Sequence, residues 1–423
     1  MNALYRRGAC PGLSAPMPTG DGLLARLIPA GTTIALEAFA GLCWAARAHG
    51  NGIIEITSRG SIQIRGLSAA SAPMLAVDVA ALRIDGSEGI PVLVNPLAGL
   101  DSDERFDAGA LAAALRTGFA AASIASGLSG KVSVVVDGGG ALHLDDVAAD
   151  VRLRAVDDAN DASFHVSLGG DTSTSVSLGV IAPEGAVACV LRLLGVLAAR
   201  TPSVRMRDAI QGEGLNAFRA AVADLVTGRP APVARPTAEP IGLHPLRMGE
   251  AAIGLGLPFG HSESETLLRL IEAGRRAGAN GLRTAPGRAL LLLGFQAAAA
   301  HAFVADAEAL GFIVDAADLR RKVVACAGAP ICASGQIPAR AMAPAVVRAT
   351  GAASPKDVIH VSGCYKGCAH PAPVPVAIFG RDGKCEVVLD GVLSRSVTVE
   401  DLPSQLKMLL TPRVESDAER DHD

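Results

Sequence analysis

The sequence is poor in aromatic residues and carries little excess charge. Aromatics make up 3% of the 423 residues, with one Trp and two Tyr, too few for the stacking platforms that bind single-stranded nucleic acids. The formal net charge of −4 offers no basic surface for a phosphate backbone. We therefore expect no nucleic-acid partner.

Long hydrophobic runs are also missing. The most apolar stretch, residues 176–199, is interrupted by Pro183, Glu184 and Arg192, so it is not typical of a transmembrane helix. The arginines near the N-terminus are not followed by the apolar segment of a secretory signal. We expect a cytoplasmic protein with no membrane partner. In that compartment thiols stay reduced, and clustered cysteines are typical of metal sites or catalysis.

Nucleotide-binding motifs are absent as well. The glycine-rich turns at 20–22 and 137–140 lack the helix start and the lysine of a phosphate-binding loop. No glycine fingerprint for NAD follows a predicted strand. If the protein is a redox enzyme, its electrons should therefore come from an external, NAD(P)H-dependent electron donor.

The chain does contain a proline-rich stretch and an internal repeat. Residues 229–240 predict an extended linker between two halves of similar length. In the first half, residues 45–67 predict a helix, an Asn-Gly stop and two strands joined by a glycine turn; residues 272–295 repeat this pattern in the second. Such duplication predicts a pseudo-twofold molecule with its ligand in the cleft between the halves.

The similarity of the halves extends further along the chain. Residues 92–101 stand where 323–335 stand later. The segment around Lys131 resembles the segment around Cys364, because both contain an apolar-Ser-Gly motif and a later apolar run. This alignment places Lys131 opposite Cys364. It predicts a metal on one side of the molecule and basic groups facing it from the other.

Four of the eight cysteines lie in two short stretches rich in glycine, proline and alanine. Their spacing is Cys326-x5-Cys332 and Cys364-x3-Cys368. Four thiolates suit either zinc or an iron–sulfur cluster, although a Cys-x5-Cys arm is looser than the tight pairs of structural zinc sites. The other four have no such neighbours, and we predict that they are buried in the core: Cys10, Cys43, Cys189 and Cys385.

The cysteine spacing resembles the sirohaem and 4Fe–4S signature of the sulfite and nitrite reductase superfamily. In that family four cysteines hold the cluster, and the last also bridges to the sirohaem iron. Residues 56–67 are similar to the family's Thr-x-Arg-Gln strand–turn–strand. Arg59 takes the place of the arginine that contacts the tetrapyrrole or anion, and Gly60 replaces the usual Gln. The resemblance covers the whole chain.

One branch of the superfamily resembles the chain most. Residues 6–27 and 252–270 look like the opening blocks of the two halves of the precorrin-3B synthases of cobalamin biosynthesis. This resemblance implies a monooxygenase that uses dioxygen to hydroxylate precorrin-3A and closes a γ-lactone. It also implies a 4Fe–4S cluster on the four clustered cysteines and an additional iron centre, either non-haem iron or sirohaem.

The fold implied by the resemblance is α+β, a duplicated pseudo-twofold architecture of ferredoxin-like half-domains and two α/β cluster-type domains. We expect it to divide the chain as follows: a ferredoxin-like half-domain at 1–70, an α/β domain without cluster at 71–228, the linker at 229–240, a second ferredoxin-like half-domain at 241–300, the 4Fe–4S-binding α/β domain at 301–411, and a disordered tail at 412–423.

The resemblance implies catalytic roles for Arg59 and Lys131, but the sequence departs from the reductases. These use two lysines, two residues apart, to hold an oxyanion; Lys131 fills the first place and Ser133 the second. A further family arginine would fall near Ile90. Because fewer cations stabilise a small oxyanion poorly, oxygen chemistry is favoured over sulfite or nitrite reduction. The ionised carboxylates of a precorrin suit arginine, and the candidates are Arg59, Arg65, Arg283 and Arg288.

Three hypotheses remain open at this point. The first is the precorrin monooxygenase, and the second is a sirohaem-dependent sulfite or nitrite reductase. The third is a non-catalytic metal or electron-transfer protein. His370, two residues after Cys368, could bind the additional iron, although packing at the end of a loop is the plainer interpretation. His360, which falls near a strand end, is a weaker candidate.

Overall fold

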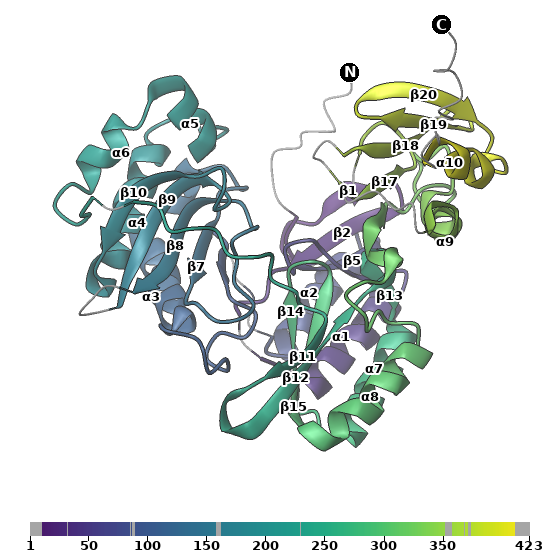
Figure 1. Cartoon of the computed structure of the whole chain (residues 1–423), viewed down its shortest axis with the longest axis horizontal. Coiled ribbons are helices and arrows are strands. Elements are labelled where there is room, and N and C mark those ends of the chain that lie inside the picture. Colours follow the sequence, from purple (N-terminus) through teal and green to yellow (C-terminus); the bar gives the residue numbers. More distant parts are fainter. Residues whose placement is uncertain are drawn as a thin grey trace, which may run out of the picture. The chain divides into compact units, whose positions relative to one another are not determined.

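The computed structural model describes residues 11–31, 33–84, 86, 89–157, 162–228, 230–351, 358–367, 369–370 and 374–410. These residues form two compact units, one built from 11–18 and 23–316 and the other from 19–22 and 317–410 (Figure 1). Cys10, Cys368 and the predicted tail at 412–423 lie outside the described residues. None of the helices in the described ranges has both the length and the apolar character needed to span a bilayer.

Two five-stranded sheets of this chain have matching strand orders. One runs β1-β2-β5-β4-β13 and the other β11-β12-β15-β14-β3. In each, a helix leads into an antiparallel hairpin, β4–β5 after α1 and β14–β15 after α7. Gly52, with φ +75°, makes the left-handed turn after α1, whereas Gly278, with φ +98°, does so after α7, earlier than the predicted Asn-Gly pair.

The strands of these sheets have the following bounds: β1 (Met17–Thr19), β2 (Gly22–Leu27), β3 (Ile34–Ala35), β4 (Ile53–Ile56), β5 (Ile62–Leu67), β11 (Gly242–Pro245), β12 (Glu250–Gly256), β13 (His261–Glu263), β14 (Gly281–Ala285) and β15 (Ala289–Gln296). Their helices are α1 (Leu36–His49), α2 (Ser71–Ala81), α7 (Ser264–Arg276) and α8 (Ala297–Ala309).

The two sheets exchange their last strands. β3, which directly precedes α1, pairs with β14 of the second half, where Leu282 faces Ile34. β13, which directly precedes α7, pairs with β4 of the first half, where Ser262 faces Ile54. One hydrophobic core contains buried residues of both halves, such as Phe39 and Phe303. The two ferredoxin-like halves are therefore interlocked by backbone pairing and by a shared core.

The two remaining sheets also share one topology. In β6-β7-β8-β9-β10, the pairs β6–β7 and β7–β8 are parallel and the others antiparallel (Figure 1, blue to teal). In β16-β17-β18-β19-β20 the same pattern recurs (Figure 1, green to yellow). The duplication predicted from the sequence is thus confirmed, and so is the α+β fold class. The predicted domain boundaries stay predictions.

These α/β domains comprise the strands β6 (Val92–Val94), β7 (Val134–Asp137), β8 (Ala149–Asp157), β9 (Ala162–Gly170), β10 (Val176–Ile181), β16 (Val323–Ala325), β17 (Ile359–Ser362), β18 (Val376–Arg381), β19 (Lys384–Leu389) and β20 (Val392–Val397). Their helices are α3 (Ala108–Ala122), α4 (Ala186–Ala198), α5 (Met206–Glu213), α6 (Asn216–Ala221), α9 (Ala339–Thr350) and α10 (Leu402–Leu410).

The sheet register corrects one alignment made from the sequence. β7 is the counterpart of β17, because Val134 pairs with β6 as Ile359 pairs with β16. Lys131 precedes its strand, whereas Cys364 follows its strand, so the prediction that they occupy equivalent places is wrong. The Ser-Gly motif misled the alignment: it comes before β7 in the first half but at the end of β17 in the second.

Candidate functional site

The described cluster cysteines lie in two loops after parallel strands. The first cysteine loop (326–335) follows β16, and the second (363–370) follows β17. Neighbouring parallel strands end at the same edge of a sheet, so their loops adjoin. The backbone N–H of Gly363 donates to Cys326 Sγ at 3.1 Å. Such N–H···S bonds stabilise a thiolate that holds a metal centre.

Glycines allow these loops to pack against each other. A Cβ atom on Gly363 would lie 2.8 Å from the Cα of Gly328 and 3.2 Å from the Cα of Gly335. A Cβ on Gly20, in the short segment that belongs to the second unit, would lie 2.4 Å from Cys332 Sγ. No side chain fits at these contacts. The glycine-rich setting of the cysteines therefore reflects close backbone packing around the thiols.

The cysteines of the chain fall into two environments. Cys326, Cys332 and Cys364 are partly exposed, so a metal centre could reach their thiols. By contrast, three others are fully buried, as predicted, and burial raises their pKa values to about 12, 12 and 11: Cys43, Cys189 and Cys385. A raised pKa keeps these thiols protonated and inert at neutral pH.

Two residues of the second cysteine loop, Tyr365 and His370, belong to a group of neighbouring rings. Tyr365 stacks on Phe379 of β18, with ring centroids 5.0 Å apart. His360 is buried inside β17, and its ring lies 5.8 Å from Phe379 and 6.1 Å from His370, centroid to centroid. Sequence reasoning named His360 and His370 but missed Tyr365 and Phe379, because the contact between these two rings joins residues that lie apart along the chain. That His370 binds the additional iron stays a prediction.

The first unit contains a counterpart of the cysteine loops. Val92 pairs with Val134 as Val323 pairs with Ile359. Counted from Val92 and Val323, Asn95 corresponds to Cys326 and Asp101 to Cys332. Counted from Val134 and Ile359, Gly139 corresponds to Cys364 and His143 to Cys368. The place of each thiol in the cysteine loops is thus taken by a glycine or a polar residue.

Hydrogen bonds join these counterpart loops (95–101 and 138–145). The buried Asn95 amide donates to Asp137 Oδ1 at 3.0 Å and to the Gly139 carbonyl at 2.8 Å, and its oxygen accepts from Gly138 N–H at 2.8 Å. Asp101 Oδ2 accepts from Ala141 N–H at 2.7 Å. The side chains at the positions of Cys326 and Cys332 therefore connect one loop to the other directly.

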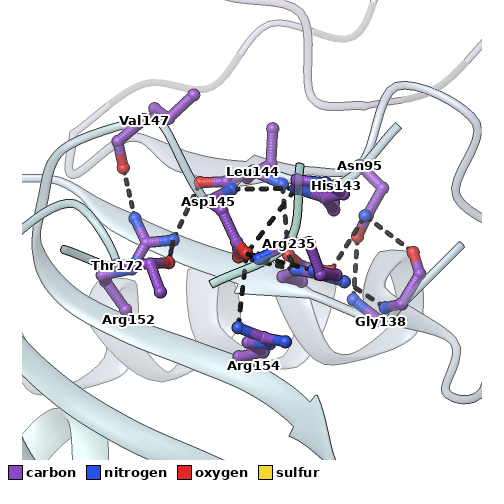
Figure 2. A network of polar contacts seen from close by, with 12 residues as sticks. Asn95, Gly138, His143, Leu144, Asp145, Val147, Arg152, Arg154, Thr172 and Arg235 are labelled. Carbon is purple, nitrogen blue, oxygen red and sulfur yellow. Dashed lines mark hydrogen bonds and ion pairs between the residues drawn. The ribbon is translucent and has the colours of Figure 1, made fainter. Parts of the chain in front are cut away.

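An arginine from the proline-rich stretch completes this arrangement (Figure 2). Arg235 Nη2 donates to Asp145 Oδ1 at 2.7 Å and also pairs with Asp137, while its Nε reaches Asp145 Oδ2 at 3.1 Å. Arg154 Nη1 approaches Asp145 Oδ2 at 3.3 Å. Burial alone would raise the pKa of Asp145, but bonds and charge from Arg235 hold it well below its usual range.

We call this set the polar network: Asn95, Asp137, His143, Asp145, Arg154 and Arg235. One ligand atom from each of Asp137, His143 and Asp145 lies within 4.8 Å of the others, a spacing that could suit a cation. The Arg235 guanidinium already pairs with both carboxylates, and Arg154 pairs with Asp145 as well. His143 Nε2 donates to the Pro236 carbonyl at 2.8 Å. The predicted linker is therefore extended but bound along the first α/β domain.

Arg59 and Lys131 both belong to the first unit. Arg59 lies in the exposed β4–β5 turn, and its Nη2 donates to Ser133 Oγ at 3.0 Å and to the Ala148 carbonyl at 2.9 Å. Ser133, which stands where the reductases have a second lysine, thus anchors the arginine. Lys131 is exposed, and its ammonium has no partner in the part of the chain that the structure describes. Ile90 is buried in the core.

Known proteins share this architecture. A family profile described as "Nitrite/Sulfite reductase ferredoxin-like half domain" matches residues 15–81. The solved structure of the NirA protein of Mycobacterium tuberculosis superposes with a TM-score of 0.76 at 18% identity, covering 95% of this chain and 82% of that one. At that identity the likeness shows the fold.

Curated relatives narrow the family. Ferredoxin–nitrite reductase of Synechococcus elongatus is 25% identical over 410 residues, 85% of this chain and 80% of that protein. Sulfite reductase (ferredoxin) 2 of Mycolicibacterium paratuberculosis is 27% identical, covering 80% of this chain and 65% of that protein. A precorrin-3B synthase from a Sinorhizobium species is 37% identical over 390 residues, 92% of this chain and 84% of that protein. The chain belongs to the precorrin-3B synthase family.

Membership of the precorrin-3B synthase family agrees with the cysteine loops. The described residues of these loops fit the 4Fe–4S cluster that was expected from the sequence. Their thiols are partly exposed, follow adjacent strands, and include one that accepts a backbone N–H. That all four predicted cysteines bind one cluster stays a prediction, because Cys368 lies outside the described residues.

Proposed function

We propose that this cobalamin-pathway enzyme is a precorrin-3B synthase that hydroxylates precorrin-3A with dioxygen and closes a γ-lactone. One oxygen atom would enter the product, and the other would leave as water with two electrons and two protons. The observation that supports this most is the 37% identity to a precorrin-3B synthase over 92% of the chain.

In this proposal the residues of the two cysteine loops hold the 4Fe–4S cluster. Cys326, Cys332 and Cys364 would supply three ligands, and Cys368 the fourth. When bound, the cluster would relay single electrons to an additional iron centre, either non-haem iron or sirohaem. The chain itself contributes in two ways. Its glycines let the backbone pack closely around the thiols, where no larger side chain would fit, and the Gly363 N–H donates to Cys326 Sγ.

Arg59 and Lys131 would bind the substrate. A precorrin has ionised acetate and propionate groups at neutral pH. Arg59 suits a carboxylate because its guanidinium is already oriented by Ser133 and Ala148, so less conformational freedom is lost on binding. Lys131 is exposed and could pair with a second carboxylate. Together these cations would orient the macrocycle.

An external protein would supply the electrons. Two of the relatives are named as ferredoxin-dependent enzymes. We therefore propose a ferredoxin-type protein or an NAD(P)H-dependent reductase as the donor.

The second candidate is a sulfite or nitrite reductase, as two relatives are named. Two residues make a reductase a poorer explanation of the site than the synthase. Ser133, at the place of the second lysine, is engaged with Arg59, and Ile90 is buried and apolar. A site with fewer cations stabilises a small oxyanion less well.

The deciding experiment supplies precorrin-3A, an electron donor and isotopically labelled dioxygen to the purified protein. We expect one labelled oxygen atom in a hydroxylated lactone. The Arg59→Gln variant should lower kcat/KM roughly ten- to a hundredfold and leave the cluster absorbance unchanged. Arg275→Gln, an exposed arginine paired with Glu272 on α7, is the matched control and should turn over normally.

An unlabelled product together with rapid sulfite or nitrite reduction would overturn the proposal. The visible spectrum of the anaerobically purified protein separates the options for the second centre. Sharp visible bands would indicate sirohaem, and a broad brown shoulder alone would indicate a cluster without it.

A further inference from the structure

The short turn between β1 and β2 lies against one of the cluster cysteines. We call residues 19–22 the hairpin tip; they belong to the second unit, together with the cysteine loops. The backbone N–H of Ala333, the residue after Cys332, donates to the Gly20 carbonyl at 3.0 Å. A segment from the N-terminal end of the chain therefore contacts the loop that carries Cys332.

This contact leaves no room for a side chain on the hairpin tip. A Cβ on Gly20 would lie 2.4 Å from Cys332 Sγ, 2.5 Å from the Ala333 nitrogen and 2.8 Å from Cys332 Cα. Two of these atoms belong to the backbone, so a rotation of the Cys332 side chain alone could not relieve the overlap. The φ of Gly20 is not left-handed. Glycine is therefore required here by the close approach to Cys332 and not by the conformation of the turn.

The backbone on either side of Cys332 is fixed within its own loop. The Cys332 N–H donates to the Gly328 carbonyl at 2.7 Å, and the Cys332 carbonyl accepts from the Gly335 N–H at 2.7 Å. A Cβ on Gly335 would lie 2.5 Å from the Ala329 nitrogen, so the loop is closely packed at this point as well. A displacement of Cys332 would therefore break hydrogen bonds or compress backbone contacts.

The hairpin tip is also a well-defined turn. Thr19 Oγ1 lies 2.8 Å from Asp21 Oδ1 and 2.8 Å from the Gly22 carbonyl. Gly22, with φ +115°, provides the left-handed backbone that leads into β2. Behind the tip, β2 pairs with β5. Gly20 is thus held in place by the turn and by the sheet that follows it.

The second ferredoxin-like half makes a matching contact. Its β11–β12 hairpin has the same place in the strand order as β1–β2. In the turn of that hairpin, Arg247 donates its backbone N–H to the Leu100 carbonyl at 2.9 Å and its Nε to the Asp101 carbonyl at 3.0 Å. Asp101 is the counterpart of Cys332. The contact therefore recurs in both halves, although only one of the two loops carries a thiol.

We propose that the hairpin tip is a positioning element of the cluster site, in which Gly20 sets the place of the Cys332 thiol. The inference rests on the cluster of the proposed function but not on its oxygen chemistry. A metal centre is bound most tightly where surrounding groups hold its ligands in the right geometry. A side chain on residue 20 should displace one ligand and so weaken the hold on iron.

The first test compares two glycine-to-alanine variants of the full-length, cluster-loaded protein. Under anaerobic conditions Gly20→Ala should release iron to a chelator roughly ten- to a hundredfold faster than the wild type. The EPR spectrum of its reduced cluster should also change, because one thiolate is displaced. Gly185→Ala is the matched control, since Gly185 has φ −82° and a Cβ there would meet Leu225 Cδ2 at an ordinary 3.7 Å. It should behave like the wild type.

A folded Gly20→Ala variant with the wild-type rate of iron release would overturn the proposal. Faster release with an unchanged EPR spectrum would indicate a merely structural role for Gly20 and would overturn it as well. If the wild type bound no cluster after reconstitution with iron and sulfide, the cluster assignment and the positioning role would fail together.

The labelled-dioxygen experiment separates this inference from the proposed oxygen chemistry. If the wild type formed no labelled lactone while Gly20→Ala still lost iron faster and changed its spectrum, the positioning role would stand and the proposed reaction would fail. If the wild type formed the labelled lactone and Gly20→Ala had no effect on the cluster, only the positioning role would be contradicted.

A second test needs no variant, so it decides the question even if Gly20→Ala fails to fold. Because coupling is reciprocal, a tip that holds the thiol is itself held by the loaded site. Peptides that cover residues 19–22 and 332–335 should exchange backbone hydrogens more slowly in the cluster-loaded wild type than in the iron-stripped protein. The β11–β12 turn is the internal control and should exchange equally in both states. Equal exchange of the hairpin tip in both states would overturn the proposal.

Discussion

The two α/β domains share one topology and differ in what joins their loops. In the domain of β16–β20, the loops carry the partly exposed thiols of Cys326, Cys332 and Cys364. In the domain of β6–β10, Asn95 and Asp101 stand at the first two of those positions and bond across to the facing loop. Strand register was kept after duplication, while the residues beyond the strand ends diverged. The same strand framework can therefore carry thiols at these loop positions in one domain and hydrogen-bonding polar residues in the other.

The difference extends to the strands behind the loops. Arg154 follows Val151 on β8 by as many residues as Phe379 follows Val376 on β18, so the two are counterparts. Arg154 pairs with Asp145, whereas Phe379 stacks on Tyr365. Charged side chains make up the polar network, whereas a pair of stacked rings stands beside Cys364 in the other domain. The environment thus changed along with the ligand positions.

The largest expected effect concerns the thiols. Replacing Cys332 and Cys364 together by alanine should remove nearly all cluster iron and sulfide, because two of the four proposed ligands are lost. Iron and sulfide assays and visible absorbance measure this. Cys385→Ala, a buried thiol on β19, is the control and should retain the cluster. If the double variant kept its full iron and sulfide content, the cysteine loops would not be what binds the cluster, and the two domains would differ for another reason.

The next effect concerns the polar network. Arg235→Ala should lower the free energy of unfolding by about 3–5 kcal/mol, because the buried Asp137 would lose Arg235 as its cation and Asp145 would keep only its weaker pair with Arg154. Urea denaturation measures it, with cluster content expected to stay constant. Arg192→Ala breaks the exposed pair with Asp224 and should change the free energy of unfolding far less, because solvent screens that pair. Equal effects of the two substitutions would contradict a structural role for the network.

Two matching glycines sharpen the comparison further. Gly363→Ala and Gly138→Ala should each cost about 1–3 kcal/mol, because the new Cβ would lie 2.8 Å from Gly328 Cα or 2.2 Å from the Phe106 carbonyl. Only Gly363→Ala should also reduce iron content. Loss of iron in Gly138→Ala, measured in the same assay, would contradict the expectation that only the domain of β16–β20 holds the cluster.

The smallest expected effect is a pH dependence confined to the first domain. Burial, with nearby Arg154 and Arg152, lowers the pKa of His165 to about 4, whereas an unfolded histidine titrates near 6.5. The unfolded chain therefore takes up the proton first. This contribution is complete above pH ~6.5 and is lost as the pH falls toward ~4.

The other domain has no histidine at the position of His165. Its counterpart there is Glu386 on β19, which pairs with Phe379 as His165 pairs with Arg154. His165→Gln should flatten the unfolding free energy between these pH values, measured by urea denaturation in matched buffers. An unchanged pH slope would rule out His165 as its source.

Local patterns predicted the duplication and the cysteine loops. The helix, strand and hairpin signals at 45–67 and 272–295 arise from neighbouring residues, so they could be recognised directly. The polar network could not, because Arg235 contacts Asp145 across 90 positions and proline content indicates only an extended chain. The place of Lys131 was misjudged for a related reason: register depends on hydrogen bonds between strands, which a repeated Ser-Gly motif does not reveal.

The exchange of β3 and β13 has a consequence for synthesis on the ribosome. The sheet that contains β4 and β5 stays incomplete until residues 261–263 have emerged, because β13 is its last strand. Until then β4 presents unpaired backbone groups at an open edge, which invites pairing with other nascent chains. The N-terminal half therefore depends on continued translation for protection, and stalling before β13 should favour chaperone binding or aggregation.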